Sequence, residues 1–467
     1  MRDVQQILAE RTARVTAAVD LLAHDRIPVV GWALFFPVHF SKKYTIQEAF
    51  YKIDVAAECF NEFFSEWNEW DAFSATLQSF APMLDATGSR RYSIPGRDIP
   101  ANAEFQFPDL SLMSAEEYPA FIADPIRFQL EVIIPRLCDR ISSSDPYERM
   151  KALTKAAMFY VESVVKAQRY APTWINEYGI PPVFQGAAIF VPTDWIADKL
   201  RGFRQGMLDI KARPDELEAA CEAMLPFMLD ACLPQVPIGS GFPLLFNPQH
   251  ISPFMSPKDY DRVYWPTFKK MVDRSVERGF KVWAFLENNQ EQHLERLQDL
   301  PKGQVVVHVE STDLAKAKKV LGGKVCLAGG MFSRLLVRGT PDDVRDQATS
   351  VLKLFEDEPG FIMANDAALP TNTKPENLHA WLDTVKKYGS LGGAAPVATG
   401  AATTSNGVGA KGKEGTGERG FSGSYSPSSW ETVKAEFGRI QGDEGVVRDS
   451  WEALEKLLPG FISWIIR

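Results

Sequence analysis

The sequence predicts an α/β protein: a TIM-type (β/α)8 barrel with extra N-terminal helices and a C-terminal helical tail. In the second half of the chain, short apolar strands alternate with capped helices, a pattern typical of a parallel sheet covered by helices. Four such units fit into roughly 130 residues with more chain upstream, which favours a closed barrel over an open sheet. No G-x-G-x-x-G motif marks the crevice of a doubly wound sheet.

The strand–helix units of the second half have clear boundaries. Ser256 and Pro257 form a helix start, and Gly279 ends that helix. Later helices begin at similar capping sequences around Asp313, Thr340 and Thr373, and the last of them ends at Gly389. The expected strands are 282–285, 305–309, 325–328 and 361–364, with a further helix at 293–300.

The first half is less regular. Helical periodicity covers 4–22, and a capping box at 45–48 opens a long helix that runs to about residue 67. We expect the first barrel strand at 70–77 and another strand at 186–191. Further helices are expected at 115–140, 147–168, 193–200 and 214–231.

Composition divides the chain into a barrel at 1–390, a flexible linker at 391–428 and a helical tail at 429–467. The linker is rich in Gly, Ala, Ser and Thr and has almost no large apolar residue, so it cannot offset its ordering entropy. The tail is apolar again but too short to make a core alone. It must dock on its own barrel or on a neighbouring subunit, and the second option predicts a homo-oligomer.

Charge and cysteine usage restrict the class of protein. The net charge of -9 and a pI near 5.4 argue against nucleic acid or an anionic membrane surface as a partner. The five cysteines are scattered without a metal-binding or disulfide pattern, which fits a reducing cytoplasm. No apolar segment approaches the roughly 20 residues that span a bilayer, and no signal peptide is visible. We expect a cytoplasmic protein.

Polar residues at the carboxyl ends of the expected strands are the candidate site, because barrel enzymes build their sites there. Glu287 directly follows an apolar strand, and burying its carboxylate is costly unless the group is paired or used. With His308 and Asp366 it is a candidate for proton transfer or metal binding, although His308 can equally be a satisfied core histidine. Substrate-binding candidates at these strand ends are Phe285, Asn289, Glu310, Met331 and Asn365.

Upstream candidates are Asp71, His39 and Tyr44. Asp71 lies near the beginning of the expected strand at 70–77. His39 and Tyr44 belong to a loop that either closes over a ligand or simply carries solvated lysines.

Four segments in the second half of the chain resemble a known protein family. They are 251–283 (ISPFMSPKDYDRVYWPTFKKMVDRSVERGFKVW), 305–331 (VVVHVESTDLAKAKKVLGGKVCLAGGM), 335–347 (LLVRGTPDDVRDQ) and 369–378 (LPTNTKPENL). Together they resemble the uroporphyrinogen decarboxylase superfamily, and within it the corrinoid-dependent methyltransferase branch. The resemblance covers about residues 250–390 well and the first half loosely. It implies the same barrel that the strand pattern predicts.

That branch usually carries zinc on a His-x-Cys pair after one strand and a Cys after the last. Here those positions fall on Phe285, Glu287 and Ala367, so the soft ligands that would activate a thiol acceptor are missing. A zinc site of hard ligands from Glu287, His308 and Asp366 stays an open option.

The resemblance therefore implies a methyltransferase component that takes a methyl group from an O- or N-methylated small molecule. The chain has no D-x-H-x-x-G motif, so the corrinoid acceptor would sit on a separate protein. Glu287, His308 or Asp366 would supply the proton to the leaving atom, and the many aromatic residues would suit a methoxyaromatic donor. The alternative is a cofactor-free decarboxylase, although the arginine-rich N-terminal stretch of uroporphyrinogen decarboxylase is not matched by FFPVHFSKKYT.

Overall fold

The computed structural model describes residues 3–77, 79–186, 188–232, 242–391, 430–438 and 443–467. The expected linker at 391–428 lies outside these residues except for its first position. No helix in this part of the chain is long and apolar enough to cross a membrane.

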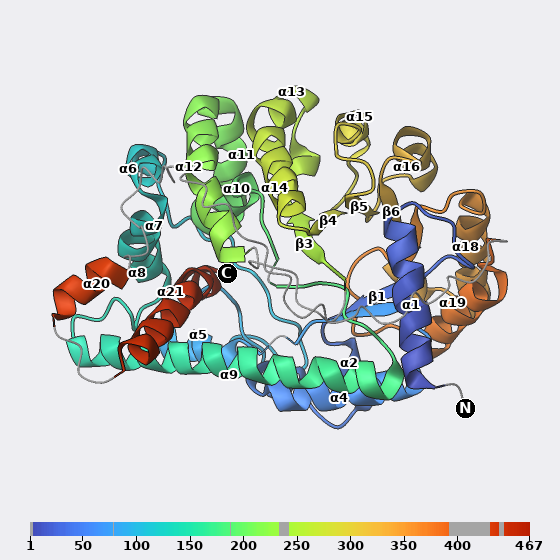
Figure 1. Ribbon diagram of the computed structural model, residues 1–467, viewed down its shortest axis with the longest axis horizontal. Helices are drawn as coiled ribbons and strands as arrows, with labels where there is room; N and C mark the ends of the chain where they lie inside the picture. The colour runs from blue at the N-terminus through green and yellow to red at the C-terminus, as the bar shows by residue number, and fades with distance from the viewer. Residues whose placement is uncertain (1–2, 78, 187, 233–241, 392–429, 439–442) are drawn as a thin grey trace.

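Seven parallel strands form one curled sheet with helices around it, a TIM-like α/β fold (Figure 1). The strand order is β2-β1-β7-β6-β5-β4-β3, so sequence neighbours from β3 to β7 are also neighbours in space. The strands are β1 (Val29–Ala33), β2 (Ala72–Ala75), β3 (Leu244–Gln249), β4 (Lys281–Leu286), β5 (Val305–Val309), β6 (Cys326–Met331) and β7 (Phe361–Asn365).

An irregular segment bridges the two edge strands. The Phe73 amide in β2 donates to the carbonyl of Pro181 at 3.1 Å, while the amides of Gln185 and Ile189 donate to β3 carbonyls at 2.9 and 2.8 Å. This segment stands where an eighth strand would close the barrel. The strand expected at 186–191 does not form a regular ladder there.

The helices of the described ranges cover the outside of the sheet. Those of the first half are α1 (Val4–Val19), α2 (Phe36–Ser41), α3 (Ile46–Tyr51), α4 (Ile53–Glu66), α5 (Ala81–Thr87), α6 (Tyr118–Ala123), α7 (Pro125–Phe128), α8 (Ile134–Leu137), α9 (Pro146–Tyr178), α10 (Pro192–Trp195), α11 (Phe203–Ala212) and α12 (Pro214–Cys232). Those of the second half are α13 (Pro257–Asp259), α14 (Trp265–Glu277), α15 (Leu294–Leu297), α16 (Leu314–Leu321), α17 (Ser333–Arg338), α18 (Pro341–Leu354), α19 (Pro375–Tyr388), α20 (Trp430–Phe437) and α21 (Glu444–Ile466).

Other expectations for the first half were wrong as well, and the single helix expected at 115–140 is a series of short segments. The strand at 70–77 is not the first, because β1 precedes it; the apolar residues of β1 run on into α2, so no polar boundary marks the strand end. The long helix expected from 46 to about 67 divides at Lys52, whose extended backbone separates α3 from α4. The capping box of Thr45 and Glu48 is confirmed.

The barrel interior is filled with aromatic side chains. The Trp32 ring contacts the rings of Phe246 and Phe285 edge-on, at centroid distances of 5.5 and 5.6 Å. The cavity that Trp32, Phe246 and His308 line has a volume of only about 10 Å³. That is room for about one water, so a substrate must bind above this layer.

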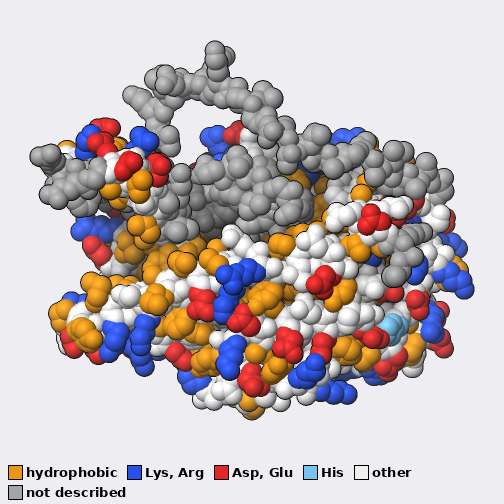
Figure 2. Space-filling view, turned by 60° about the horizontal axis from the view of Figure 1, so that its bottom comes forward, with side chains coloured by type: hydrophobic (Ala, Val, Ile, Leu, Met, Phe, Trp, Pro, Cys, Tyr) orange, Lys and Arg blue, Asp and Glu red, His pale blue; other side chains and the backbone are white. Residues whose placement is uncertain are grey.

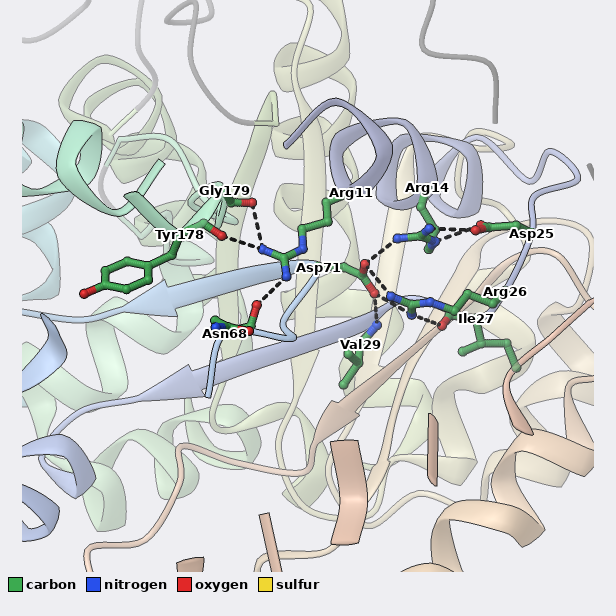
Figure 3. A network of polar contacts seen from close by, with 10 residues as sticks. All are labelled: Arg11, Arg14, Asp25, Arg26, Ile27, Val29, Asn68, Asp71, Tyr178 and Gly179. Carbon is green, nitrogen blue, oxygen red and sulfur yellow. Dashed lines mark hydrogen bonds and ion pairs between the residues drawn. The ribbon is translucent and has the colours of Figure 1, made fainter. Parts of the chain in front are cut away.

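Asp71 lies at the amino end of the barrel, where it joins α1 to the sheet (Figure 3). Its carboxylate accepts hydrogen bonds from Arg14 at 2.6 Å, from Arg26 at 2.8 and 2.9 Å, and from the Val29 amide at 2.8 Å. The side chain is fully buried. Asp71 was expected to bind substrate, but this end of a barrel serves stability, and Asp71 is part of a structural ion-pair network.

The C-terminal helix docks on its own chain. In α21, the Trp464 ring lies edge-on to Phe80 and tilted to Tyr160, at ring-centroid distances of 5.8 and 5.0 Å. Ile465 and Ile466 are buried. In Figure 1 α21 lies beside α8 and α12. Of the two docking options for the tail, the structure therefore shows docking on its own barrel.

Helix α9 exposes hydrophobic side chains along its length. In Figure 2 hydrophobic and charged side chains alternate over the face that α9 and α4 present. Tyr147, Met150, Met158 and Val161 are each about half exposed or more. Leu153, Val164 and Val165 are also exposed, so hydrophobic side chains recur every three to five residues over 147–165 of this helix.

Candidate functional site

The centre of the candidate site is His250, which follows β3 directly. Because Gln249 in β3 is paired with Leu286 in parallel β4, the next residues, His250 and Glu287, leave the sheet side by side. Nε2 of His250 lies 3.0 Å from a carboxylate oxygen of Glu287. Nδ1 lies 2.6 Å from a carboxylate oxygen of Asp198. The imidazole is thus held between two carboxylates at the mouth of the barrel.

The two carboxylates decide the charge of this imidazole. Burial alone would lower the pKa of His250, but its hydrogen bonds with Asp198 and Glu287 raise that pKa well above the ordinary value. His250 is therefore an imidazolium at neutral pH. About a third of its side chain is exposed at the mouth, and both of its N–H groups face carboxylates.

Asp194 fixes the backbone that carries His250. One of its oxygens accepts the amides of His250 at 3.1 Å and Ile251 at 2.9 Å, and the other accepts the Tyr264 hydroxyl at 2.6 Å. Burial raises the pKa of Asp194 to about 7, against the opposing effect of the His250 charge. Asp194 is a positioning residue.

A π-helical turn at 196–201 follows α10 and carries Asp198. The wider turn brings Asp198 to the ring of His250 while Asp194, four residues earlier, holds its backbone. Such turns are rare and are found mainly at functional sites.

Two further carboxylates, those of Glu310 and Asp366, lie at the carboxyl ends of the strands, the edge of the sheet that we call the rim. Glu310, after β5, accepts the Asn288 amide, and burial together with the charges of Glu287 and Asp366 raises its pKa. Asp366, after β7, accepts the amide and hydroxyl of Ser333, and burial raises its pKa too. Both therefore hold a proton more readily than free carboxyls do.

His308 lies inside the barrel, below the rim. Its Nδ1 accepts the Trp283 indole N–H at 3.1 Å, which leaves the proton on Nε2, donated to the Asn365 carbonyl at 2.9 Å. Burial lowers the pKa of His308 to about 4. Of the two interpretations open from the sequence, the geometry favours the satisfied core histidine, not a proton donor.

The other candidates at the strand ends are mostly structural. Asn365 joins β7 to β1, because its side chain bonds to the amide and the carbonyl of Trp32 at 3.1 and 3.0 Å. Phe285 and Met331 are buried. Asn289 is exposed, and its side chain accepts the Glu291 amide at 2.9 Å.

His39 and Tyr44 lie beside a separate hollow of about 310 Å³ near α2. Lys42 and Lys43 line it as well. The Tyr44 hydroxyl donates to Glu58 at 2.9 Å, so this loop is anchored to α4. The structure brings these residues together, but it does not join them to the His250 group.

Sequence reasoning missed His250, Asp194 and Asp198. The usable signal was the apolar run at 242–246 followed by a polar residue at 250. Pro248 obscured it, since proline is rare inside strands; β3 tolerates it because regular ladder pairing occurs on one side only. No sequence pattern marks Asp194 and Asp198 as site residues, and only the fold brings them to His250.

The rim residues do not fit a zinc ion. Both ring nitrogens of His308 are used inside the barrel. At His250 the carboxylates of Asp198 and Glu287 face opposite ring nitrogens, so the three groups cannot converge on one ion. No group of three or more His, Cys, Asp or Glu side chains suited to a metal occurs within the described ranges.

We expect elemental analysis of the purified protein to find far less than one zinc per chain. The donors diverge, and Glu287→Ala should leave this low content unchanged. Stoichiometric zinc that disappears in Glu287→Ala would contradict the assignment of Glu287 to His250.

Comparisons with known proteins show which family this chain is similar to. The model of the uroporphyrinogen decarboxylase (URO-D) family matches residues 126–388, more than half of the chain. A uroporphyrinogen decarboxylase from Chlorobaculum tepidum is 35% identical over 78 residues, which are 16% of this chain and 22% of that protein. The chain thus aligns with less than a quarter of that relative's length.

Among solved structures, a methyltransferase from Methanosarcina mazei superposes with a TM-score of 0.54 at 16% identity. The superposition covers 81% of this chain and 98% of that one, so the two share a fold. Taken with the family match, the resemblance expected from the sequence is confirmed: the chain belongs to the uroporphyrinogen decarboxylase family.

Proposed function

We propose that this protein is a methyltransferase component that takes a methyl group from an O- or N-methylated small molecule and passes it to a corrinoid on a separate protein. The observation that supports this most is the imidazolium of His250, held between Asp198 and Glu287 at the mouth. The methyltransferase with the same fold, matched over nearly its whole length, adds support.

Demethylation needs a proton at the leaving atom. When the C–O or C–N bond breaks, the oxygen or nitrogen keeps the electron pair, and a positioned acid that protonates it lowers the barrier. His250 supplies that proton through Nε2 or by way of Glu287, and solvent then restores it. A reduced corrinoid on the partner supplies the nucleophile that accepts the methyl group, and no residue of this chain is assigned to hold it.

The aromatic layer below the mouth suits a flat donor. Trp32 is partly exposed, and Phe246 and Phe285 pack around it at the top of the filled interior. Such a floor favours a methoxyaromatic ring stacked above it.

A cofactor-free decarboxylase is the second candidate, favoured by buried cations near the mouth. Arg91 and Lys199 are almost fully buried and would attract a substrate carboxylate. After loss of CO₂ the carbanion would take its proton from the same His250.

The test is an assay of the purified protein with a panel of methoxyaromatic acids and methylated amines, with and without a reduced corrinoid protein. We expect demethylated product, measured by chromatography, only when the corrinoid protein is present. Release of CO₂ from a carboxylate without any corrinoid would support the decarboxylase instead. No turnover of any compound in either condition would overturn both.

A further inference from the structure

Helix α9 exposes one apolar side along most of its length. Seven large hydrophobic side chains between positions 147 and 165 are each 37–71% exposed. They are Tyr147, Met150, Leu153, Met158, Val161, Val164 and Val165. At 3.6 residues per turn, all seven fall within an arc of about 140° around the helix axis. They therefore form one continuous band along the helix, which we call the α9 stripe.

No charged residue interrupts the α9 stripe. From the start of the helix to Pro172, the other positions in the same arc are uncharged: Pro146, Thr154, Ala157, Gln168, Ala171 and Pro172. The charged residues of this part of the helix all lie outside the arc: Glu148, Arg149, Lys151, Lys155, Glu162, Lys166 and Arg169. Hydrophobic and charged side chains thus alternate over the wider face (Figure 2), but not along the stripe. A helix face that remains in water normally carries polar and charged residues.

The α9 stripe is not the side by which α9 packs on the barrel. The inner side is marked by buried Ala156 and Trp174, which lie about 130° around the axis from the middle of the stripe. The docked tail leaves the stripe open as well, because Phe461 and Trp464 of α21 contact α9 at Tyr160, just outside the arc. Within the described residues, the stripe therefore faces solvent.

The size of the α9 stripe fits a protein partner. The exposed parts of its seven side chains amount to on the order of 700 Å², near the roughly 800 Å² that each partner contributes to a standard interface. The largest apolar patch on a monomeric protein is typically about 300–600 Å². The segment 392–429 has few large apolar residues and offers little hydrophobic surface to match it.

The spacing of the stripe suits a second copy of the same helix. Its middle has heptad spacing, with alternate a and d positions at Tyr147, Met150, Thr154, Ala157, Val161 and Val164. An antiparallel copy, related by a two-fold axis between positions 155 and 156, places each a residue opposite a d residue of the copy. Tyr147 then lies opposite Val164, and Met150 lies opposite Val161. The small side chains of Thr154 and Ala157 meet at the centre, where they let the two helices approach closely.

We propose that the α9 stripe is the interface of a symmetric homodimer, in which α9 packs antiparallel on α9 of a second copy. The stripe pairs with itself, as an interface with two-fold symmetry requires, and its removal from water drives the association. An anionic membrane surface fits less well, because the net charge of the chain is -9. The proposal is independent of the reaction at the mouth.

Sedimentation equilibrium of the full-length protein tests the dimer. At about 50 µM, well above the Kd of a micromolar interface, we expect twice the chain mass of 52.2 kDa. The double variant Met158→Glu and Val161→Glu should have the mass of one chain, because dimerisation would bury its new carboxylates without partners. Both side chains are exposed in the single chain, so the melting temperature of the fold should be retained. Lys155→Glu, on the same helix but outside the stripe, should stay dimeric.

Three results would overturn the proposal. The first is the mass of a single chain for the unmodified protein at the same concentration. The second is a dimer that persists in the folded double variant, because the contact would then lie on another face. The third is a monomeric protein that binds phosphatidylserine vesicles and loses this binding in the double variant, which would assign the α9 stripe to a membrane surface.

Discussion

Replacing His250 by glutamine is expected to lower kcat for demethylation about 10²- to 10⁴-fold, the usual contribution of a general acid. Glutamine keeps a polar side chain between Asp198 and Glu287 but carries no transferable proton. His379→Gln is the matched control, because His379 also pairs with a carboxylate, that of Glu66 at 3.2 Å, on the exposed surface. Steady-state rates with a saturating donor measure the effect.

The pH profile separates proton donation from a structural role. Since the carboxylates raise the pKa of His250, the imidazolium persists to high pH, and activity is lost as pH rises through that raised pKa. Asp198→Asn removes one carboxylate, lowers the pKa of His250 and should move this alkaline limb to lower pH. A limb that stays in place in Asp198→Asn, or His250→Gln with full kcat, would exclude His250 as the acid.

Replacing Asp71 by alanine is expected to destabilise the fold by about 3–5 kcal/mol, the cost of breaking a buried ion pair from one side. Among the described residues, the change leaves the buried Arg14 guanidinium with Asp25 as its carboxylate partner and Arg26 with the Ile27 carbonyl. It also leaves the Val29 amide without its acceptor. Urea unfolding followed by circular dichroism measures the loss.

Asp342→Ala serves as control, because the Asp342 side chain is 88% exposed and pairs with Arg345 at the surface. It should cost less than about 0.5 kcal/mol. Asp71→Ala should also leave KM unchanged at a temperature where it is folded. A stable Asp71→Ala protein with a raised KM would restore the substrate-binding role first expected of Asp71.

The sequence allowed β4 to β7 to be predicted because each is an apolar run bounded by local capping signals. β5 was predicted at its observed bounds. β1 and β3 were missed for local reasons as well: β1 runs into an apolar helix, and β3 contains Pro248. Local sequence patterns therefore predict β4 to β7 better than they predict β1 and β3.

The candidate site shows the same limit. Glu287 was recognisable because a carboxylate at the end of a buried strand is unusual on its own. Its partner His250 comes from strand pairing across β3 and β4, and Asp198 arrives from a π-helical turn far earlier in the chain. The sequence left His308 open between a proton donor and a satisfied core histidine, and its hydrogen bonds with Trp283 and Asn365 favour the core histidine.

The hydrogen bond from Arg91 to the Ile466 carbonyl joins positions 375 residues apart. A ribosome that adds about 5–20 residues per second needs roughly 20–75 s to make that stretch. Throughout this time Arg91 has emerged, but the helix that covers it does not yet exist. Until α21 has been synthesised and has folded back, the Arg91 guanidinium therefore lacks one of its two carbonyl acceptors.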